Sequence, residues 1–77
     1  MEQLEKTIFT FAARAYNVDE ATLSRDTNIK KDLSSQSLLM VSLVSMIENE
    51  LEVFIPLTAA AKFETLGDVI DQVASVM

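Results

Sequence analysis

The residues best suited to chemistry lie in the middle of the chain, where positions 32–38 read DLSSQSL. This stretch places Ser37 at the start of a long apolar segment, and the chain contains no cysteine and no histidine. The usual nucleophile, the usual general base and the softer metal ligands are therefore absent. If the chain takes part in covalent chemistry, a hydroxyl must accept the reactive group from another molecule. Ser37 is the best-placed hydroxyl.

Other polar residues have simpler interpretations. Serine is a preferred N-cap residue, so Ser37 taken alone could be only the cap of a helix. Ser34 and Ser35 are expected to be loop residues that bond to nearby backbone groups. Asp68 and Asp71 indicate the start of a helix rather than a catalytic pair. No spacing of carboxylates resembles a calcium loop, and we expect no metal site, no catalytic residue and no enzyme activity of the chain's own.

Length and composition predict one small domain over residues 1–77, built from helices. With 49% apolar residues, the chain is too hydrophobic to be disordered. One glycine and one proline argue against a turn-rich β architecture. A domain of this size buries only about 60% of its unfolded surface, which leaves little room for a buried catalytic pocket.

The hydrophobic periodicity predicts four helices. Residues 2–16 carry apolar side chains at intervals of three and four, as in an amphipathic helix. Residues 37–51 form a second helix, residues 58–63 a short third one, and Thr65 begins a fourth in a capping-box pattern. Residues 17–36 make an unusually long connection, and such loops are often functional. Four apolar side chains should pin it to the core: Val18, Leu23, Ile29 and Leu33.

The fold class predicted by this pattern is all-α, a small four-helix bundle with three main helices, a short third helix and a long first loop. In a domain so small, half-exposed aromatic rings are costly. We therefore expect four aromatic side chains in the core: Phe9, Tyr16, Phe54 and Phe63.

The second predicted helix is apolar on nearly all sides, because no charged residue lies between Asp32 and Glu48. At about 100° per residue, the natural core face holds Met40, Leu43, Val44, Ile47 and Leu51. The opposite face holds Leu38, Val41, Ser42, Ser45 and Asn49, with Leu39 and Met46 on the flank. Such a helix is either central or contacts a partner, and in so short a chain we favour a hydrophobic contact surface beside Ser37.

The net charge of −6 arises entirely in the second part of the chain. Residues 1–31 hold five acids and five bases, whereas residues 32–77 hold seven acids and one base, Lys62. Nucleic acid and anionic membranes are poor partners for such a surface, and Lys30-Lys31 is too short for a nucleic-acid patch. No segment reaches the roughly 20 apolar residues of a membrane span, and no signal-peptide pattern is present. We expect a cytoplasmic monomer without membrane insertion.

An ordered set of motifs runs along the chain: DLSSQSL at positions 32–38, Ile55-Pro56, and TLGDV at positions 65–69. Together they resemble the acyl carrier protein family, whose second helix opens on an Asp-Leu-Gly-x-Asp-Ser-Leu stretch. Positions between and before the motifs also fit the family: Val18, Leu23, Asp26, Leu33, Val41, Leu43, Val44, Ile47, Glu48 and Glu50. The resemblance spans nearly the full length and needs no insertion.

The resemblance implies that Ser37 carries a 4′-phosphopantetheine arm, transferred from coenzyme A by a phosphopantetheinyl transferase. The arm would supply the thiol that the chain lacks, and acyl groups would ride on it as thioesters. A phosphodiester at a helix N-terminus is favourable, because free backbone N–H groups and the positive end of the helix dipole meet it there. Further partners would be acyl-transferring and acyl-modifying enzymes of fatty-acid, polyketide or related biosynthesis.

Two sets of side chains gain expected roles from this resemblance. Partner recognition is expected at Gln36, Leu38, Leu39, Val41, Ser42, Ser45, Glu48 and Asn49. An acyl chain is expected to slip between the helices against apolar, partly flexible walls. These walls are Met40, Leu43, Ile47, Leu51 and Phe54.

The sequence departs from the family pattern at two places. Gln36 stands where the family has an aspartate that is thought to help the transferring enzyme hold its metal ion, and an amide is a poorer ligand for a hard cation. Modification of Ser37 is then slow, dependent on a dedicated transferase, or lost. Leu39, Ser42 and Asn49 replace acids that meet basic patches on partner enzymes in many members. We expect partner recognition that is more hydrophobic and less sensitive to salt.

Two alternatives remain open. The chain could be a carrier-like interaction module that has lost modification and binds partners through its second helix. Gln36 favours this alternative, and the retained Ser37-Leu38 favours a carrier. The cargo could also be peptidyl or aminoacyl, because partner enzymes choose it. The short, capped ends favour a free-standing protein over a piece of a larger synthase.

Overall fold

This computed structural model describes residues 2–77, except for the side chains of Glu2 and Ser37. The helices of the described residues are α1 (Glu2–Tyr16), α2 (Ser37–Leu51), the short α3 (Leu57–Ala60) and α4 (Leu66–Val76). Two single turns, η1 (Glu20–Thr22) and η2 (Ile29–Leu33), lie between α1 and α2. The predicted all-α bundle of three main helices and a short third helix is confirmed.

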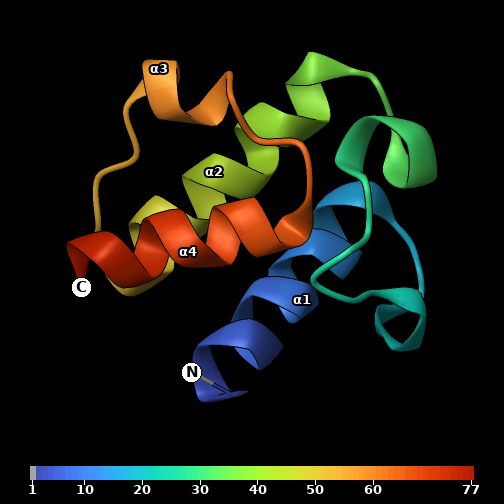
Figure 1. Ribbon diagram of the computed structural model, residues 1–77, viewed down its shortest axis with the longest axis horizontal. Coiled ribbons are helices and arrows are strands. Elements are labelled where there is room, and N and C mark those ends of the chain that lie inside the picture. The colour runs from blue at the N-terminus through green and yellow to red at the C-terminus, as the bar shows by residue number, and fades with distance from the viewer. Residues whose placement is uncertain (1) are drawn as a thin grey trace.

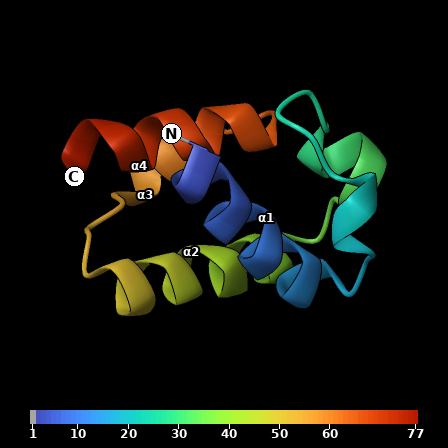
Figure 2. The ribbon, with the colours of Figure 1, turned by 90° about the horizontal axis from the view of Figure 1, so that it is seen from below.

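The bundle is organised around α1, which packs against both α2 and α4. The short α3 lies on the other side of the α2–α4 pair from α1 (Figure 1). In the perpendicular view, α2 and α4 run along opposite sides of the molecule, and the connection between α1 and α2 closes one end (Figure 2). Within residues 2–77, no helix has the length and apolar character needed to cross a membrane.

The first helix begins and ends where the periodicity predicts. Its inward stripe includes Ile8 and Ala12, both fully buried, and Tyr16, which is 8% exposed. Asn17 ends the helix in a left-handed conformation with φ of 56°, and the N–H of Val18 bonds back to the carbonyl of Ala13 at 3.0 Å. Asparagine is one of the few residues that adopt this conformation readily, so the sequence specifies the stop.

The connection from 17 to 36 contains two helical turns that the sequence did not predict. In η2, the side chain of Asn28 accepts a hydrogen bond from the N–H of Lys31 at 2.9 Å, and Asp32 accepts one from the N–H of Asn28 at 2.8 Å. The predicted anchoring is confirmed, because Ile29 is 1% exposed and Val18, Leu23 and Leu33 are partly buried against the core. The long connection is therefore ordered, and it positions the start of α2.

This connection is tied to the start of α4 by backbone hydrogen bonds, which we call the α4 latch. Its three bonds run from the N–H groups of Ile29, Leu66 and Gly67 to the carbonyls of Glu64, Thr27 and Arg25, at 2.9, 3.1 and 2.9 Å. A Cβ at position 67 would lie 3.0 Å from the carbonyl oxygen of Arg25. The only glycine of the chain therefore stands where two backbone segments approach each other closely.

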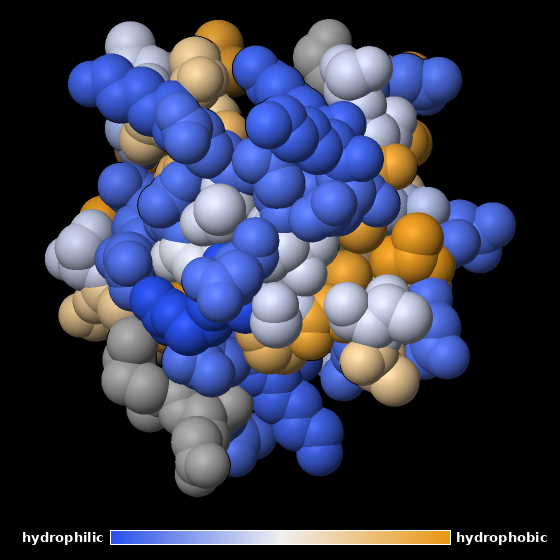
Figure 3. Space-filling model, turned by 45° about the vertical axis from the view of Figure 1, so that its right-hand side comes forward, coloured by the Kyte–Doolittle hydropathy of each residue, from blue (hydrophilic) through white to orange (hydrophobic). Residues whose placement is uncertain are grey.

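Arg25 adds a surface link at the same place. Its guanidinium contacts Glu5 of α1 at 2.9 Å and Asp71 of α4 at 2.6 Å. The side chain of Arg25 is 39% exposed, so water and salt screen these pairs, and we attribute little stability to them. The face seen from the side of the connection is mostly hydrophilic, with hydrophobic side chains gathered toward one margin (Figure 3).

The core lies between the helices and contains mainly aliphatic side chains. The fully buried members from α2 are Leu43 and Ile47, and those from α4 are Leu66, Val69, Ile70 and Val73. Of the predicted core aromatics, Tyr16 and Phe63 are buried and Phe9 is partly buried.

The prediction that Phe54 lies in the core is wrong, because its side chain is 72% exposed. Glu52 ends α2 with φ of 54°, and the chain beyond it is not helical. Val53 and Ile55 on either side pack into the core, so Phe54 points outward. The predicted third helix over 58–63 is also shifted, because Pro56 is the N-cap residue and the helix spans Leu57–Ala60.

Candidate functional site

The start of α2 lacks the features that stabilise most helix starts. Gln36 is its N-cap residue, with φ of −73° and ψ of 115°, and the Gln36 side chain makes no capping hydrogen bond. The first turn contains no acidic side chain. Ser37 is the first helical residue, so the interpretation of Ser37 as only an N-cap does not hold. The side chain of Ser37 itself lies outside the described part of the structure.

The residues before Ser37 are held by local hydrogen bonds. The N–H of Ser34 bonds to the carbonyl of Ile29 at 2.8 Å and closes η2. The Oγ of Ser34 accepts a hydrogen bond from the N–H of Gln36 at 3.1 Å, which confirms the prediction that Ser34 serves local backbone groups. The backbone thus delivers Ser37 to the helix start from an ordered turn.

The electrostatics at this point suit an anion. The first N–H groups of a helix have no partners within the helix and form the positive end of its dipole. Among the described side chains, none caps the start of α2, and Lys30 and Lys31 are exposed in the preceding turn. The residues present therefore fit a phosphodiester attached at position 37.

Several large apolar side chains on α2 and on the segment that follows it are exposed to solvent. Four of them form what we call the apolar face: Leu38, Val41, Phe54 and Leu57, which are 73%, 50%, 72% and 80% exposed. The predicted exposure of apolar side chains on the second helix is thus confirmed for Leu38 and Val41. Large exposed apolar groups that extend along one helix and the segment after it are typical of a contact surface.

The remaining residues predicted to recognise partners fall into three groups. Gln36, Ser45 and Asn49 are exposed, and Ser42 is partly exposed. Leu39 is partly buried and packs against the core, which limits its reach toward a partner. The Oε2 of Glu48 accepts a hydrogen bond from the N–H of Ile55 at 2.9 Å, so Glu48 also fixes the segment after α2.

A groove of about 490 Å³ runs between α2 and α3, and we call it the α2–α3 groove. Of the residues predicted to hold an acyl chain, Met40 and Phe54 line this groove. Leu43 and Ile47 do not line it and are fully buried in the core. Leu51 is half-buried and packs against the core. The other lining residues are Val41, Val44, Ser45, Glu48, Ile55, Pro56, Leu57, Thr58 and Ala60.

A second hollow, of about 330 Å³, lies beside Gln36 and is lined by Tyr16; we call it the Tyr16 hollow. Its other lining residues are Ile29, Lys30, Ser34, Ser35, Met40, Val41, Leu57, Ala60, Ala61 and Phe63. The hydroxyl of Tyr16 is buried and has no hydrogen-bond partner among the described residues. Burial also raises the pKa of Tyr16 above its ordinary value, so the phenol is neutral at physiological pH.

Sequence reasoning assigned Tyr16 to the core and missed its polar end. The signal available was its place in the stripe of Ile8 and Ala12, four residues apart, where every other inward side chain is apolar. A hydroxyl in such a stripe requires a partner from elsewhere.

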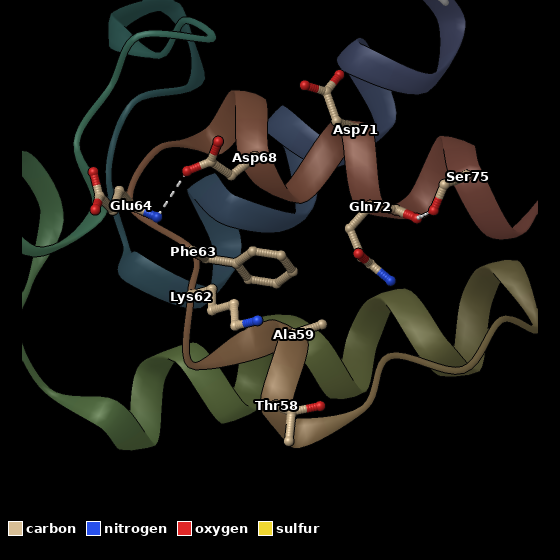
Figure 4. A pocket seen from close by; sticks show the side chains of 9 residues that line it. All are labelled: Thr58, Ala59, Lys62, Phe63, Glu64, Asp68, Asp71, Gln72 and Ser75. Carbon is tan, nitrogen blue, oxygen red and sulfur yellow. Dashed lines mark hydrogen bonds between the residues drawn. The ribbon is translucent and has the colours of Figure 1, made fainter.

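A third hollow, between α3 and α4, is polar and open, with a volume of about 690 Å³ (Figure 4). Lys62, Glu64, Asp68 and Asp71 are among its lining residues. The carboxylate of Asp68 accepts hydrogen bonds from the N–H groups of Glu64 and Thr65, which hold its pKa below the ordinary value. Asp68 is thus a structural cap, as the sequence predicted.

Comparison with known proteins gives a consistent result. Residues 6–73 match the family model described as the phosphopantetheine attachment site. The chain is 30% identical over 73 residues to an acyl carrier protein of Porphyromonas gingivalis, covering 95% of this chain and 94% of that protein. It is 33% identical over 69 residues to an acyl carrier protein of Rickettsia typhi, covering 90% of this chain and 80% of the relative. The matched region includes the whole of α2 and its start.

Proposed function

The chain belongs to the phosphopantetheine attachment family of acyl carrier proteins, whose cofactor is 4′-phosphopantetheine, and we propose that Ser37 is the residue that bears it. The protein then carries acyl intermediates as thioesters and presents them to enzymes of fatty-acid, polyketide or related biosynthesis. The observation that carries this proposal is the position of Ser37, the first residue of a helix whose start is capped by none of the described side chains.

The neighbouring hydroxyls are weaker candidates. Ser34 already accepts a hydrogen bond from Gln36, and Ser35 precedes the helix. Ser37 alone is followed by the leucine of the family motif and lies at the positive end of α2. Ser35 and Leu38 on its two sides are exposed, so a transferring enzyme has access to this part of the backbone.

In this proposal, the chain's own residues bind and orient the cofactor and its cargo, and they perform no catalysis. The bound cofactor supplies a thiol, which this cysteine-free chain lacks. The backbone N–H groups at the start of α2 hold the phosphate, and Lys30 and Lys31 lower the energy of its charge. The apolar face receives partner enzymes, beginning with the phosphopantetheinyl transferase. The α2–α3 groove, between Met40 and Phe54, accepts the apolar part of the cargo.

The test is an intact mass spectrum after incubation with coenzyme A and a broad-specificity phosphopantetheinyl transferase. We expect a mass gain of one phosphopantetheine in the parent chain and none in Ser37→Ala. Ser35→Ala is the matched control, because it removes an exposed hydroxyl two residues away and should still be modified. Modification of Ser37→Ala, or its loss in Ser35→Ala, would contradict the assignment.

A second candidate function is an interaction module that is no longer modified. The observation that favours it is Gln36, an uncharged and exposed side chain where the family motif has aspartate. If the folded parent chain gains no mass, Gln36→Asp should be tested in the same reaction. A gain in Gln36→Asp indicates a carrier that needs a dedicated transferase, whereas no gain in either chain supports the interaction module.

A further inference from the structure

The two hollows on either side of Val41 form one continuous strip of the surface. The α2–α3 groove and the Tyr16 hollow share four lining residues: Met40, Val41, Leu57 and Ala60. Val41 and Leu57 are exposed, so the middle of the strip is apolar and open to solvent. Contiguous exposed apolar groups mark interaction sites. We call the two hollows and their shared residues the α2–α3 strip.

The two ends of the α2–α3 strip carry opposite charges. Among the described residues that line the Tyr16 hollow, Lys30 is the only one with a charge. Among those that line the α2–α3 groove, Glu48 is the only one. Glu52 follows four residues after Glu48, so it lies one turn further along the same side of α2. The strip therefore runs from a cationic end through an apolar middle to an anionic end.

A surface with this pattern is complementary to itself. In a dimer with two-fold symmetry, the same patch of both copies forms the interface, and every contact between two different residues occurs twice. A two-fold axis at Val41 and Leu57 places the two apolar middles against each other. It also places Lys30 of each copy against the acidic end of the other copy, so opposite charges meet at both ends.

Phe54 gives this interface an anchor. Its side chain lines the α2–α3 groove and is exposed, and its direction is fixed because Val53 and Ile55 pack into the core. With the two strips antiparallel, the groove of one copy faces the Tyr16 hollow of the other. An apolar cavity of roughly 150 Å³ accepts a benzene ring, so a hollow of about 330 Å³ has room for the ring of Phe54. Aromatic anchors in pockets supply most of the binding energy in many interfaces.

We propose that the α2–α3 strip of the unmodified chain binds a second copy of this chain in an antiparallel, two-fold symmetric dimer. Phe54 of each copy enters the Tyr16 hollow of the other, and Lys30 pairs with Glu48 and Glu52 across the interface. The surface of the whole chain is 4865 Å². An interface confined to the strip belongs to the class below about 1,200 Å² in total, whose complexes are weak. We expect a dissociation constant on the order of 10–100 µM.

This dimer has a consequence for the carrier function. The interface covers Gln36 and Val41, which lie close to Ser37 on either side along the chain. Dimer formation and binding of the transferase therefore exclude each other. This consequence rests on the proposed attachment at Ser37, whereas the dimer itself does not. The monomer expected from the sequence is then the form at low concentration.

The first experiment measures the mass in solution of the unmodified chain by sedimentation equilibrium, between about 5 and 500 µM. We expect the average mass to rise from that of one chain toward that of two. Phe54→Ser should remain a monomer throughout. Val76→Ser is the matched control, because Val76 is also exposed, at 46%, but lies in α4 outside the strip, and this variant should dimerise like the parent. A parent that stays monomeric, or a Phe54→Ser variant that dimerises equally, would overturn the inference.

The second experiment exchanges charges between the two ends of the strip. Lys30→Glu and Glu52→Lys each place like charges together at both ends, so each variant alone should dimerise at least roughly fivefold more weakly than the parent. An equimolar mixture of the two variants should recover the affinity of the parent, because opposite charges again meet at both ends. A general loss of solubility or stability cannot produce this recovery. A mixture that associates no better than either variant alone would contradict the antiparallel pairing.

Both experiments use the unmodified chain, so their outcome is separate from that of the carrier function. If Ser37 gains phosphopantetheine and the parent stays monomeric at all concentrations, the carrier function stands and this inference fails. If Ser37 gains no mass and the exchanged variants recover affinity only in the mixture, the dimer stands and the attachment fails.

Discussion

At the start of α4, Thr65 and Asp68 satisfy backbone N–H groups on both sides of the helix boundary. At the start of α2, Ser34 accepts a hydrogen bond from the N–H of Gln36 before the boundary, and none of the described side chains bonds to an N–H of the first helical turn. The two helices belong to the same bundle and are of comparable length, with 11 and 15 residues. The start of α4 is closed by the chain's own carboxylate and hydroxyl. The start of α2 is the place where we propose that an external anion binds. The comparison shows that the missing cap coincides with the proposed site of attachment.

The largest effect on stability is expected from removing the side-chain cap at the start of α4. The double substitution Thr65→Ala with Asp68→Ala removes both halves of the capping box. Loss of an N-cap side chain costs about 0.5–2 kcal/mol, so the double variant should lose roughly 2 kcal/mol of unfolding free energy in a urea titration. Gln36→Ala at the start of α2 is the matched control. Equal losses in the two variants would remove the contrast between the two helix starts.

Lowering the pH should weaken the same cap without mutation, because it protonates the carboxylate of Asp68. The N–H groups of Glu64 and Thr65 hold the pKa of Asp68 below its ordinary value in the folded chain. A carboxyl with a depressed folded-state pKa stabilises the fold above its unfolded-state pKa and loses this contribution as pH falls through the folded-state value. The stability difference between the parent and Asp68→Asn should therefore be complete at neutral pH and shrink below about pH 4. A difference that stays constant in thermal melts down to pH 3 would argue against this account.

A smaller effect on stability is expected from adding a side-chain cap at the start of α2. Gln36→Asp gives this helix a capping carboxylate, and we expect a gain of about 0.5–1 kcal/mol in unfolding free energy. Gln36→Ala should change the stability by less than about 0.5 kcal/mol, because the side chain makes no capping hydrogen bond. Chemical denaturation of the three chains side by side measures both effects. A clear loss in Gln36→Ala would show that the start of α2 is already stabilised.

The smallest effect is expected from salt on partner binding. The apolar face carries Leu38 and Val41 beside Gln36, and the first turn of α2 has no acid. Raising the salt concentration from about 0.05 to 0.5 M should therefore change the affinity for the phosphopantetheinyl transferase by less than about threefold. Val41→Ser should weaken binding more than the salt does, as measured by calorimetry. A steep decline of affinity with salt would show that charges elsewhere on the surface dominate recognition.

Much of the fold could be predicted because its elements are specified locally. The stripe through Ile8 and Ala12 gives α1, and the spacing of Thr65 and Asp68 gives the start of α4. The η2 turn was missed because it depends on two interlocking side-chain bonds, from Asn28 and Asp32, and on backbone bonds to a distant segment. Phe54 was assigned to the core by residue type, whereas its orientation follows from its buried neighbours.

The candidate site was predictable in part for a related reason. Ser37 and the exposed Leu38 and Val41 follow from motif and helix periodicity. The residues that line the α2–α3 groove could not be predicted in this way, because they depend on where α3 lies against α2. Periodicity also could not distinguish Met40, which lines the groove, from Leu43, which is fully buried. The lack of a hydrogen-bond partner for the Tyr16 hydroxyl among the described residues could not be predicted from the sequence, because it depends on how all the helices pack together.

The α4 latch has a consequence for timing in the cell. The connection that precedes Ser37 is bonded through Arg25, Thr27 and Ile29 to backbone groups of residues 64–67, roughly 35 to 42 positions later in the chain. A ribosome must therefore synthesise this later segment before the turn and the start of α2 reach their final shape. A transferase that recognises this shape would act on the finished protein and not on the growing chain. A short peptide containing DLSSQSL should accordingly be a poor substrate.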